Sequence, residues 1–441
     1  MYGSDFSDFN DDLVIQNATL PSGKPASIGI RNGVILQIAP WISIEHVKTV
    51  VNAGGLHVLP GLINTHVHDR IPGGEHKEDW DSIERSAIAG GVTTVCVMPN
   101  TNPPIVTVEA LCDKIKRVGA REINWLQWAG TTGDNLGELC ELLEGPRVPG
   151  VKLYMSETTG VGGITDPKKQ RRVYELAAEC GCPVPTHAQD QALMDRNRAS
   201  VRKPLRLHSH CEIQTTEVEV SAVKQALEHG RVTGAHVWIC HVSCPESVEL
   251  CQDAKQRGQK VTVELAPQYL YLWDTLLSDP RYGARVKVNP SLRSLEQVER
   301  MREYLDRPGY FDVVGDDHAP HLLPEKRQRS YDRRPSGMPG LQTTFSLLAD
   351  LVFEDDLPLE RFVELTSTNA ADLLGLKHKG RIEVGADADL VLADFFDIWC
   401  IQDRDIVSKC GWTPYRNRFV HGVPCYTIVG GKVHKLKDYA H

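Results

Sequence analysis

Six side chains that can bind or activate a metal ion follow short apolar runs of this sequence. His66 and His68 are separated by one residue, and alternate residues at a strand end point the same way, so both imidazoles can reach one ion. Any one of the six has an ordinary explanation as a packed or surface residue. Burying all of them without partners would cost several kcal/mol per ion, so together they predict a metal centre. The set is His66, His68, Lys152, His187, His241 and Asp317.

The apolar runs that precede these residues predict a closed parallel barrel. Buried parallel strands have continuous apolar sequences and need helical crossovers between them, and helical patterns separate most of these runs. The side chains above would then lie at the carboxyl ends of the strands, where barrel active sites form. We therefore expect an α/β fold, a (β/α)₈ barrel, with strands in 56–64, 92–99, 123–130, 150–155, 183–188, 236–242, 261–266 and 312–317.

The two ends of the chain have a different pattern. Residues 12–54 alternate between apolar and polar side chains and contain turn signals at Ser22-Gly23 and Asn32-Gly33, as hairpins do. RIEVGADADLVLADF and YTIVGGKVHKL repeat this style near the other end. We predict a small β-sandwich domain from residues 1–55 and 380–441, which flanks a barrel domain of residues 56–379.

Composition limits the partners of the chain. Its 441 residues carry a net charge of −9, which disfavours nonspecific binding to nucleic acid or anionic membranes. No apolar run approaches the roughly 18 residues of a membrane span. The start, MYGSDFSDFNDD, resembles an acidic tail rather than a targeting signal, so we expect a cytoplasmic protein. The partner is then a small molecule.

The 12 cysteines are scattered through apolar segments without a Cys-X-X-Cys pair, so we expect reduced thiols. Cys240 and Cys244 flank His241, but no second pair at finger spacing completes a zinc knuckle. Two long connections, 189–213 and 318–340, are rich in Arg and Lys and follow barrel strands. They suggest an anionic substrate, although solvated loops explain them equally well.

PGLINTHVHDRIPGGEHKEDW resembles the opening of the barrel in the dihydroorotase family of the amidohydrolase superfamily. The similarity continues in the family's order and covers almost the whole chain after residue 12. Its further segments are VKLYM, PVPTHAQD, ICHVSCPESVELC, VTVELAPQYL, KVNPSLRS, GDDHAPH, PSGMPGLQT and KCGWTPY.

The resemblance assigns roles to the metal-binding residues. It implies two divalent ions, zinc by preference, with His66, His68 and Asp317 on the buried ion and His187 and His241 on the exposed one. Carbon dioxide would carboxylate Lys152, and this N6-carboxylysine and a hydroxide would bridge the ions. The catalytic Asp317 would take the proton of the hydroxide and return it to the departing ring nitrogen. The implied reaction interconverts N-carbamoyl-aspartate and dihydroorotate in pyrimidine biosynthesis.

The resemblance also assigns the substrate residues. Arg70, with Asn100 and His321, would bind the carboxylate of the substrate, an anionic small molecule. Asn289 and the Pro335-Ser336-Gly337 turn would line the other edge of its ring. A surface ion pair of Arg70 with Glu75 or Asp79 is the plain alternative. The resemblance further suggests a homo-oligomer, a dimer or tetramer, and allows a complex with a pathway enzyme such as aspartate transcarbamoylase.

Four positions depart from the family pattern. Asn64 replaces a usual Asp, Asp69 an apolar residue, Gln189 a usual Glu, and Gln268 the His of many dihydroorotases. APQYL is closer to dihydropyrimidinases and hydantoinases. A dihydropyrimidinase, hydantoinase or allantoinase that acts on an uncharged ring therefore remains the nearest alternative. A metal-free scaffold protein is a second, but it should have lost ligands.

Overall fold

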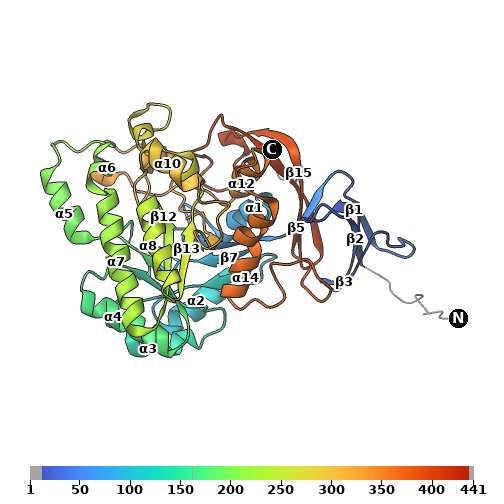
Figure 1. Ribbon diagram of the computed structural model, residues 1–441, viewed down its shortest axis with the longest axis horizontal. Helices are drawn as coiled ribbons and strands as arrows, with labels where there is room; N and C mark the ends of the chain where they lie inside the picture. The colour runs from blue at the N-terminus through green and yellow to red at the C-terminus, as the bar shows by residue number, and fades with distance from the viewer. Residues whose placement is uncertain (1–11, 161, 437–441) are drawn as a thin grey trace.

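The computed structural model describes residues 12–160 and 162–436, and a closed parallel barrel forms its centre (Figure 1). The barrel strands pair in chain order, and β8 runs directly into β9. The backbone of His318, just after β14, closes the ring, because its N–H donates to the His66 carbonyl and its carbonyl accepts from the His68 N–H. The strands are β6 (Leu62–Val67), β7 (Val92–Val97), β8 (Asn124–Gln127), β9 (Ala129–Gly130), β10 (Val151–Tyr154), β11 (Pro183–His187), β12 (His236–Val242), β13 (Val261–Leu265) and β14 (Val313–Val314).

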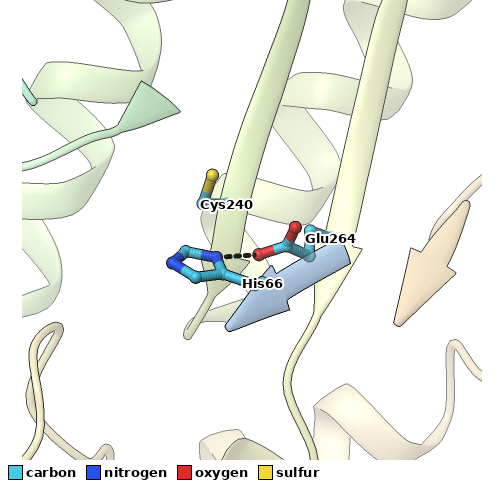
Figure 2. Close-up of side chains that lie close together, drawn as sticks. All are labelled: His66, Cys240 and Glu264. Carbon is cyan, nitrogen blue, oxygen red and sulfur yellow. Dashed lines mark hydrogen bonds and ion pairs between the residues drawn. The ribbon is translucent and has the colours of Figure 1, made fainter. Parts of the chain in front are cut away.

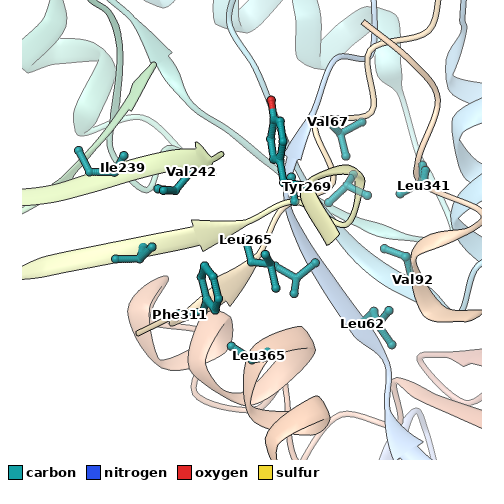
Figure 3. Close-up of a cluster of buried hydrophobic side chains, with 14 of the residues drawn as sticks. Leu62, Val67, Val92, Ile239, Val242, Leu265, Tyr269, Phe311, Leu341 and Leu365 are labelled. Atoms are coloured by element: carbon teal, nitrogen blue, oxygen red, sulfur yellow. The ribbon is translucent and has the colours of Figure 1, made fainter. Parts of the chain in front are cut away.

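Helices cover the outside of the barrel, and the main apolar core lies between them and the strands. Figure 3 shows part of this core, which includes Leu62, Ile239 and Leu265 from three strands together with Phe311 and Leu365. The longer helices are α1 (Trp80–Ala89), α2 (Val108–Val118), α3 (Leu136–Leu143), α4 (Pro167–Glu179), α7 (Thr216–Thr233), α8 (Pro245–Gln256), α10 (Leu295–Arg302) and α12 (Thr344–Phe353). Shorter ones are α9 (Gln268–Tyr271), α13 (Leu359–Val363), α14 (Asn369–Leu373), η1 (Asp274–Ser278), η2 (Gly283–Val286), η4 (Glu364–Thr368) and η5 (Asp403–Asp405).

Strands from both ends of the chain form one eight-stranded sheet beside the barrel. These strands enclose a separate apolar cluster that includes Ile15, Ile28, Val58 and Leu390. The predicted fold class, a (β/α)₈ barrel with a small β-sandwich from both termini, is confirmed. The strands are β1 (Leu13–Thr19), β2 (Pro25–Arg31), β3 (Val34–Ala39), β4 (Thr49–Asn52), β5 (His57–Pro60), β15 (Leu390–Cys400), β16 (Phe419–Val429) and β17 (Lys432–Lys435).

One predicted barrel strand is only partly correct. The run 56–64 divides at Gly61: β5 pairs with β15 in the terminal sheet, and only β6 enters the barrel. The hydrogen bonds mark the division, because the Gly61 N–H donates to the Asp389 carbonyl whereas the Leu62 N–H donates to the Gly91 carbonyl. An added Cβ at residue 61 would lie 2.3 Å from the Thr93 side chain, so the crossing point needs glycine. Both halves are buried, so the apolar pattern alone does not show this division.

The hairpin turns at Gly23 and Asn32-Gly33 are confirmed, because β1 pairs with β2 and β2 with β3 in antiparallel register. The two long connections are not simple loops. The first contains α5 (Gln191–Ser200) and α6 (Ser209–Ile213), and the second contains α11 (Leu323–Lys326) and η3 (Tyr331–Arg333). A hydrogen bond of 2.8 Å between His210 Nδ1 and the Tyr331 hydroxyl joins them.

The segment 401–418, predicted as part of the small domain, packs on the barrel. Trp412 Nε1 donates to the His321 carbonyl at 2.7 Å, and Arg285 pairs with Asp403. The exact domain boundaries stay a prediction. All 12 cysteines are free thiols, as expected. Across residues 12–160 and 162–436, no helix is long and apolar enough to cross a membrane. The predicted acidic tail lies mostly outside the described residues.

Candidate active site

The carboxyl ends of the barrel strands bring the six predicted metal-binding residues together. Five of them line one pocket, and Lys152 on β10 is fully buried in the barrel interior nearby. The same pocket is lined by Arg70, Asn100, Asn289, Ser336 and Gly337, which come from four different turns. Its further lining residues are Tyr154, Thr158, Thr159 and Ala319.

His66, His68 and Asp317 form a buried group whose ligand atoms lie within 4.8 Å of one another. His68 Nε2 lies 2.9 Å and His66 Nε2 3.4 Å from the same Asp317 oxygen, Oδ1. Burial raises the pKa of Asp317, but His66, His68 and Lys152 outweigh it and hold this pKa at about 2. Burial lowers the pKa of both imidazoles. The group therefore offers a carboxylate and two neutral nitrogens near neutral pH.

His187 and His241 form the second pair, with His187 Nδ1 2.9 Å from His241 Nε2. Burial, reinforced by Lys152, lowers the pKa of His187 to about 4. Burial also holds the pKa of His241 well below its usual value. His241 and Asp317 have positive φ angles, +35° and +50°, which non-glycine residues adopt mainly where the surrounding structure forces them to.

Three of these imidazoles form a hydrogen bond to a side-chain oxygen through one ring nitrogen. His66 Nδ1 contacts Glu264 at 2.7 Å, His68 Nδ1 contacts Asn100 at 2.7 Å, and His187 Nε2 contacts Gln189 at 2.9 Å. Metal-binding histidines usually donate their other ring N–H in this way, which fixes the tautomer and leaves the second nitrogen free for the ion. Within the described residues the buried His241 Nδ1 has no partner, and together with these contacts this fits a metal centre.

Lys152 is fully buried, and its Nζ donates to Cys240 Sγ at 2.9 Å. Among the residues that the structure describes, no carboxylate lies within ion-pair distance of this amine. A free ammonium here would be costly, so the position fits a lysine that reacts with carbon dioxide. Cys244, which follows His241 by three residues, contacts Glu219 and Ser247.

Arg70, one of the predicted carboxylate-binding residues, lines the pocket. Arg70 has a φ of +64°, and its Nε donates to the Pro320 carbonyl at 3.2 Å. The predicted alternative is absent: within the described part of the chain Arg70 forms no ion pair, while Glu75 accepts from Gly73 and Asp79 caps α1. The guanidinium therefore keeps donors for a ligand.

His321 is not a pocket-lining residue. Its ring is buried, and its Nε2 lies 3.3 Å from Arg70 Nη2 and 3.1 Å from the Ser336 carbonyl oxygen. Its Nδ1 lies 3.2 Å from Lys77 Nζ. Asn100 does line the pocket, but its Oδ1 contacts His68. The structure thus places Arg70 and Asn100 at the pocket, with His321 supporting Arg70.

A series of hydrogen bonds between side-chain amides connects Asn289 to His187, one of the proposed metal-binding residues. His187 donates to Gln189, whose Nε2 donates to Gln214 Oε1 at 3.1 Å. Gln214 donates to Asn289 Oδ1 at 2.9 Å, and Asn289 Nδ2 donates to Thr158 Oγ1 at 3.0 Å. Gln189 thus replaces the usual Glu with a neutral acceptor that keeps the contact to His187.

The Pro335-Ser336-Gly337 turn is held by the buried Lys326 side chain. Lys326 Nζ donates to the carbonyls of Lys287, Pro335 and Gly337 at 3.0, 2.9 and 2.8 Å. An added Cβ at Gly337, where φ is +127°, would lie 2.6 Å from the Ala319 carbonyl. This close packing lets the turn line the pocket.

The other departures have separate structural explanations. Asp69 pairs with the fully buried Lys114 at 2.8 Å and accepts from Trp80 Nε1 at 3.0 Å, so it supports the barrel wall. Asn64 Oδ1 accepts from the His66 N–H at 3.0 Å. Gln268 is buried outside the pocket lining, and its Nε2 has no partner within the described residues.

Sequence reasoning missed three kinds of residue. Glu264 lies inside the apolar run VTVELA, where a lone acidic residue is a signal that could have been used. Tyr154 follows Lys152 by two residues and so points the same way along β10. Thr158 and Thr159 lie on the next turn and have no distinctive spacing.

Residues 57–433 match the amidohydrolase family profile. The chain belongs to this family, whose members are metal-dependent. Curated relatives of this chain include proteins named dihydroorotase. One from Halobacterium salinarum is 38% identical over 420 residues, 95% of each chain. Another, from Methanosphaera stadtmanae, is 30% identical over 427 residues, 96% of each chain.

Similar solved structures include hydantoinases. L-hydantoinase (dihydropyrimidinase) from Arthrobacter aurescens has a TM-score of 0.90 and 28% identity, with 96% of each chain covered. A D-hydantoinase has a TM-score of 0.88 and 27% identity, with 96% of this chain and 94% of that chain covered. These structures share the fold of this chain.

Proposed function

We propose that this protein is a dihydroorotase that interconverts N-carbamoyl-aspartate and dihydroorotate through a two-metal centre. The observation that carries the proposal is one pocket in which Arg70 faces a convergent set of histidines and Asp317. The names of relatives at 30–38% identity over nearly the whole chain support the same substrate. The hydantoinase interpretation accounts for the metal-binding residues equally well, but leaves Arg70 without a charge to bind.

His66, His68 and Asp317 would hold one divalent ion and His187 and His241 the other, with carboxylated Lys152 supplying oxygens to both. Imidazole and carboxylate ligands suit zinc. Two metal ions bound in this way would polarise an amide carbonyl and make hydroxide available near neutral pH. The predicted homo-oligomer, pathway complex and cytoplasmic location remain proposals.

The residues of the chain supply the remaining steps. Arg70 binds the substrate carboxylate through a charge-assisted hydrogen bond and so orients the ring. The Asp317 carboxylate accepts a proton from the water that adds to the carbonyl carbon. It then returns this proton to the ring nitrogen as the C–N bond breaks. Ring closure reverses these transfers and consumes one proton from solution.

The test is a comparison of four ring substrates with the purified protein. Dihydroorotate should be opened much faster than dihydrouracil, hydantoin or allantoin, and its equilibrium with N-carbamoyl-aspartate should favour the closed ring in acid. Equal or faster turnover of an uncharged ring would favour the hydantoinase alternative. No turnover of any ring, together with no bound metal, would leave the scaffold interpretation.

A further inference from the structure

The Glu264 carboxylate lies in the barrel interior, next to the proposed ligand His66. Figure 2 shows it pointing at the His66 ring, with the Cys240 thiol nearby on β12. The ligand atoms of these three buried residues lie within 4.8 Å of one another, close enough to hold a cation. Glu264 could thus be a metal ligand or a residue that holds ligands, and its hydrogen bonds distinguish the two.

Both carboxylate oxygens are fully used by donors. Oε1 accepts from His66 Nδ1 at 2.7 Å and from the His241 N–H at 3.1 Å. Oε2 accepts from Thr65 Oγ1 at 2.9 Å and from Trp238 Nε1 at 3.2 Å. A carboxylate has about four lone-pair sites, so none is left for an ion. Displacing the backbone and indole N–H groups would leave buried donors unpaired.

These contacts connect the two halves of the proposed metal centre. His66 lies on β6 and His241 on β12, and the two residues would bind different ions. Because His241 has a φ of +35°, its backbone needs support, and Glu264 holds its N–H. One carboxylate therefore fixes the imidazole of one ligand and the backbone of the other.

The segment that follows β14 also packs closely against this carboxylate. An added Cβ at Gly315 would lie 2.6 Å from both Glu264 Cδ and Thr65 Oγ1. Residue 315 precedes Asp316 and Asp317, so glycine here lets the chain that carries Asp317 approach the carboxylate. Four strand ends thus meet around Glu264.

We propose that Glu264 is a positioning residue that holds the ligands of both ions in their binding geometry. By accepting a hydrogen bond from the Nδ1–H group it keeps His66 in the tautomer whose Nε2 is free for an ion. By accepting the His241 N–H it fixes the strained turn that aims the second imidazole. This inference rests on the proposed metal centre, but not on the identity of the ring substrate.

The test measures metal affinity and the ligand field rather than activity alone. Glu264→Gln keeps the size of the side chain but replaces an acceptor oxygen with a donor, so at least one buried donor loses its partner. Affinity for both ions should fall about 10- to 100-fold, measured with Zn²⁺ against a competing chelator. The visible spectrum of the Co²⁺-loaded protein should shift, because the geometry of His66 and His241 changes.

Two matched variants separate this effect from ordinary destabilisation. Trp238→Phe removes one donor but keeps the charge and three hydrogen bonds, so its loss of affinity should be smaller. Asp350→Asn alters a buried carboxylate that binds His421 and Tyr271 away from the pocket, and its affinity and Co²⁺ spectrum should match the wild type. If Glu264→Gln does not fold, Glu264→Asp, which keeps the charge but shortens the reach, should show the same loss.

The outcomes separate this inference from the proposed function. A wild-type protein that takes up no divalent ion would overturn both. A wild type that binds two ions, with a Glu264 variant of equal affinity and an unchanged Co²⁺ spectrum, would overturn the positioning role alone.

Discussion

The proposed metal-binding residues and the proposed substrate residues share a pocket but have different supports. The first set lies on barrel strands or within three residues of their carboxyl ends, and each member is at most 9% exposed. The second set, Arg70, Asn100, Asn289 and the turn around Ser336, lies on connections. We therefore propose that the barrel strands hold the metal-binding residues and that the connections select the ring substrate. This division explains how a chain with dihydroorotase relatives can share its fold with hydantoinases.

The largest effect should come from Asp317, which belongs to the strand-end set. Asp317→Asn removes a metal-binding oxygen and the proton carrier together, so kcat should fall roughly 10⁴-fold with weaker metal binding. Asp316→Asn is the matched control, because Asp316 accepts from the His318 N–H and Thr344 Oγ1 outside the pocket. Steady-state kinetics and elemental analysis of both variants test this prediction. A larger loss of rate and metal in Asp316→Asn than in Asp317→Asn would contradict the role assigned to Asp317.

Lys152→Ala should lose at least about 10²-fold in rate and most of the bound metal, because no other pocket residue supplies two oxygens between the ions. Added acetate, which provides two carboxylate oxygens, should restore part of the rate. Metal analysis and turnover with and without acetate test this. Full metal content and turnover in the variant would exclude a role for carboxylated Lys152.

The connections should show a smaller effect, on stability rather than rate. Burial, reinforced by Lys287, lowers the pKa of His210 to about 3, whereas the unfolded chain titrates near 6.5. Between these pH values the unfolded state binds more protons, so the contribution of His210 to stability is complete above 6.5 and is lost as the pH falls. From pH 7 to pH 5 the wild type should lose about 2 kcal/mol relative to His210→Gln.

Denaturant titrations across this pH range measure the difference. Tyr331→Phe removes the hydroxyl partner of His210 but keeps the imidazole, so it should retain the pH dependence of the wild type. If the free energy of unfolding depends on pH in the same way in the wild type and in His210→Gln, His210 does not cause the predicted loss of stability.

The sequence could predict the barrel and the metal-binding set because buried parallel strands leave apolar runs and the ligands follow their ends. It could not show the division at Gly61, since both neighbouring segments are buried. Nor could it show the contact between Asp69 and Lys114, which are 45 residues apart. The helices within 189–213 were missed because that segment has no clear apolar periodicity, and α5 buries only Met194. The positive φ angles of His241 and Asp317 arise from tertiary packing.

The measurement that tests the division most directly is the preference for dihydroorotate over dihydrouracil in the wild type and in Arg70→Met. A pocket built for a charged group should favour dihydroorotate by at least about 10³ in kcat/KM. Arg70→Met should erase most of this preference and keep both metal ions, whereas Arg334→Met, an arginine outside the pocket lining, should keep the preference. An unchanged preference in Arg70→Met, or a wild type without any preference, would contradict the account.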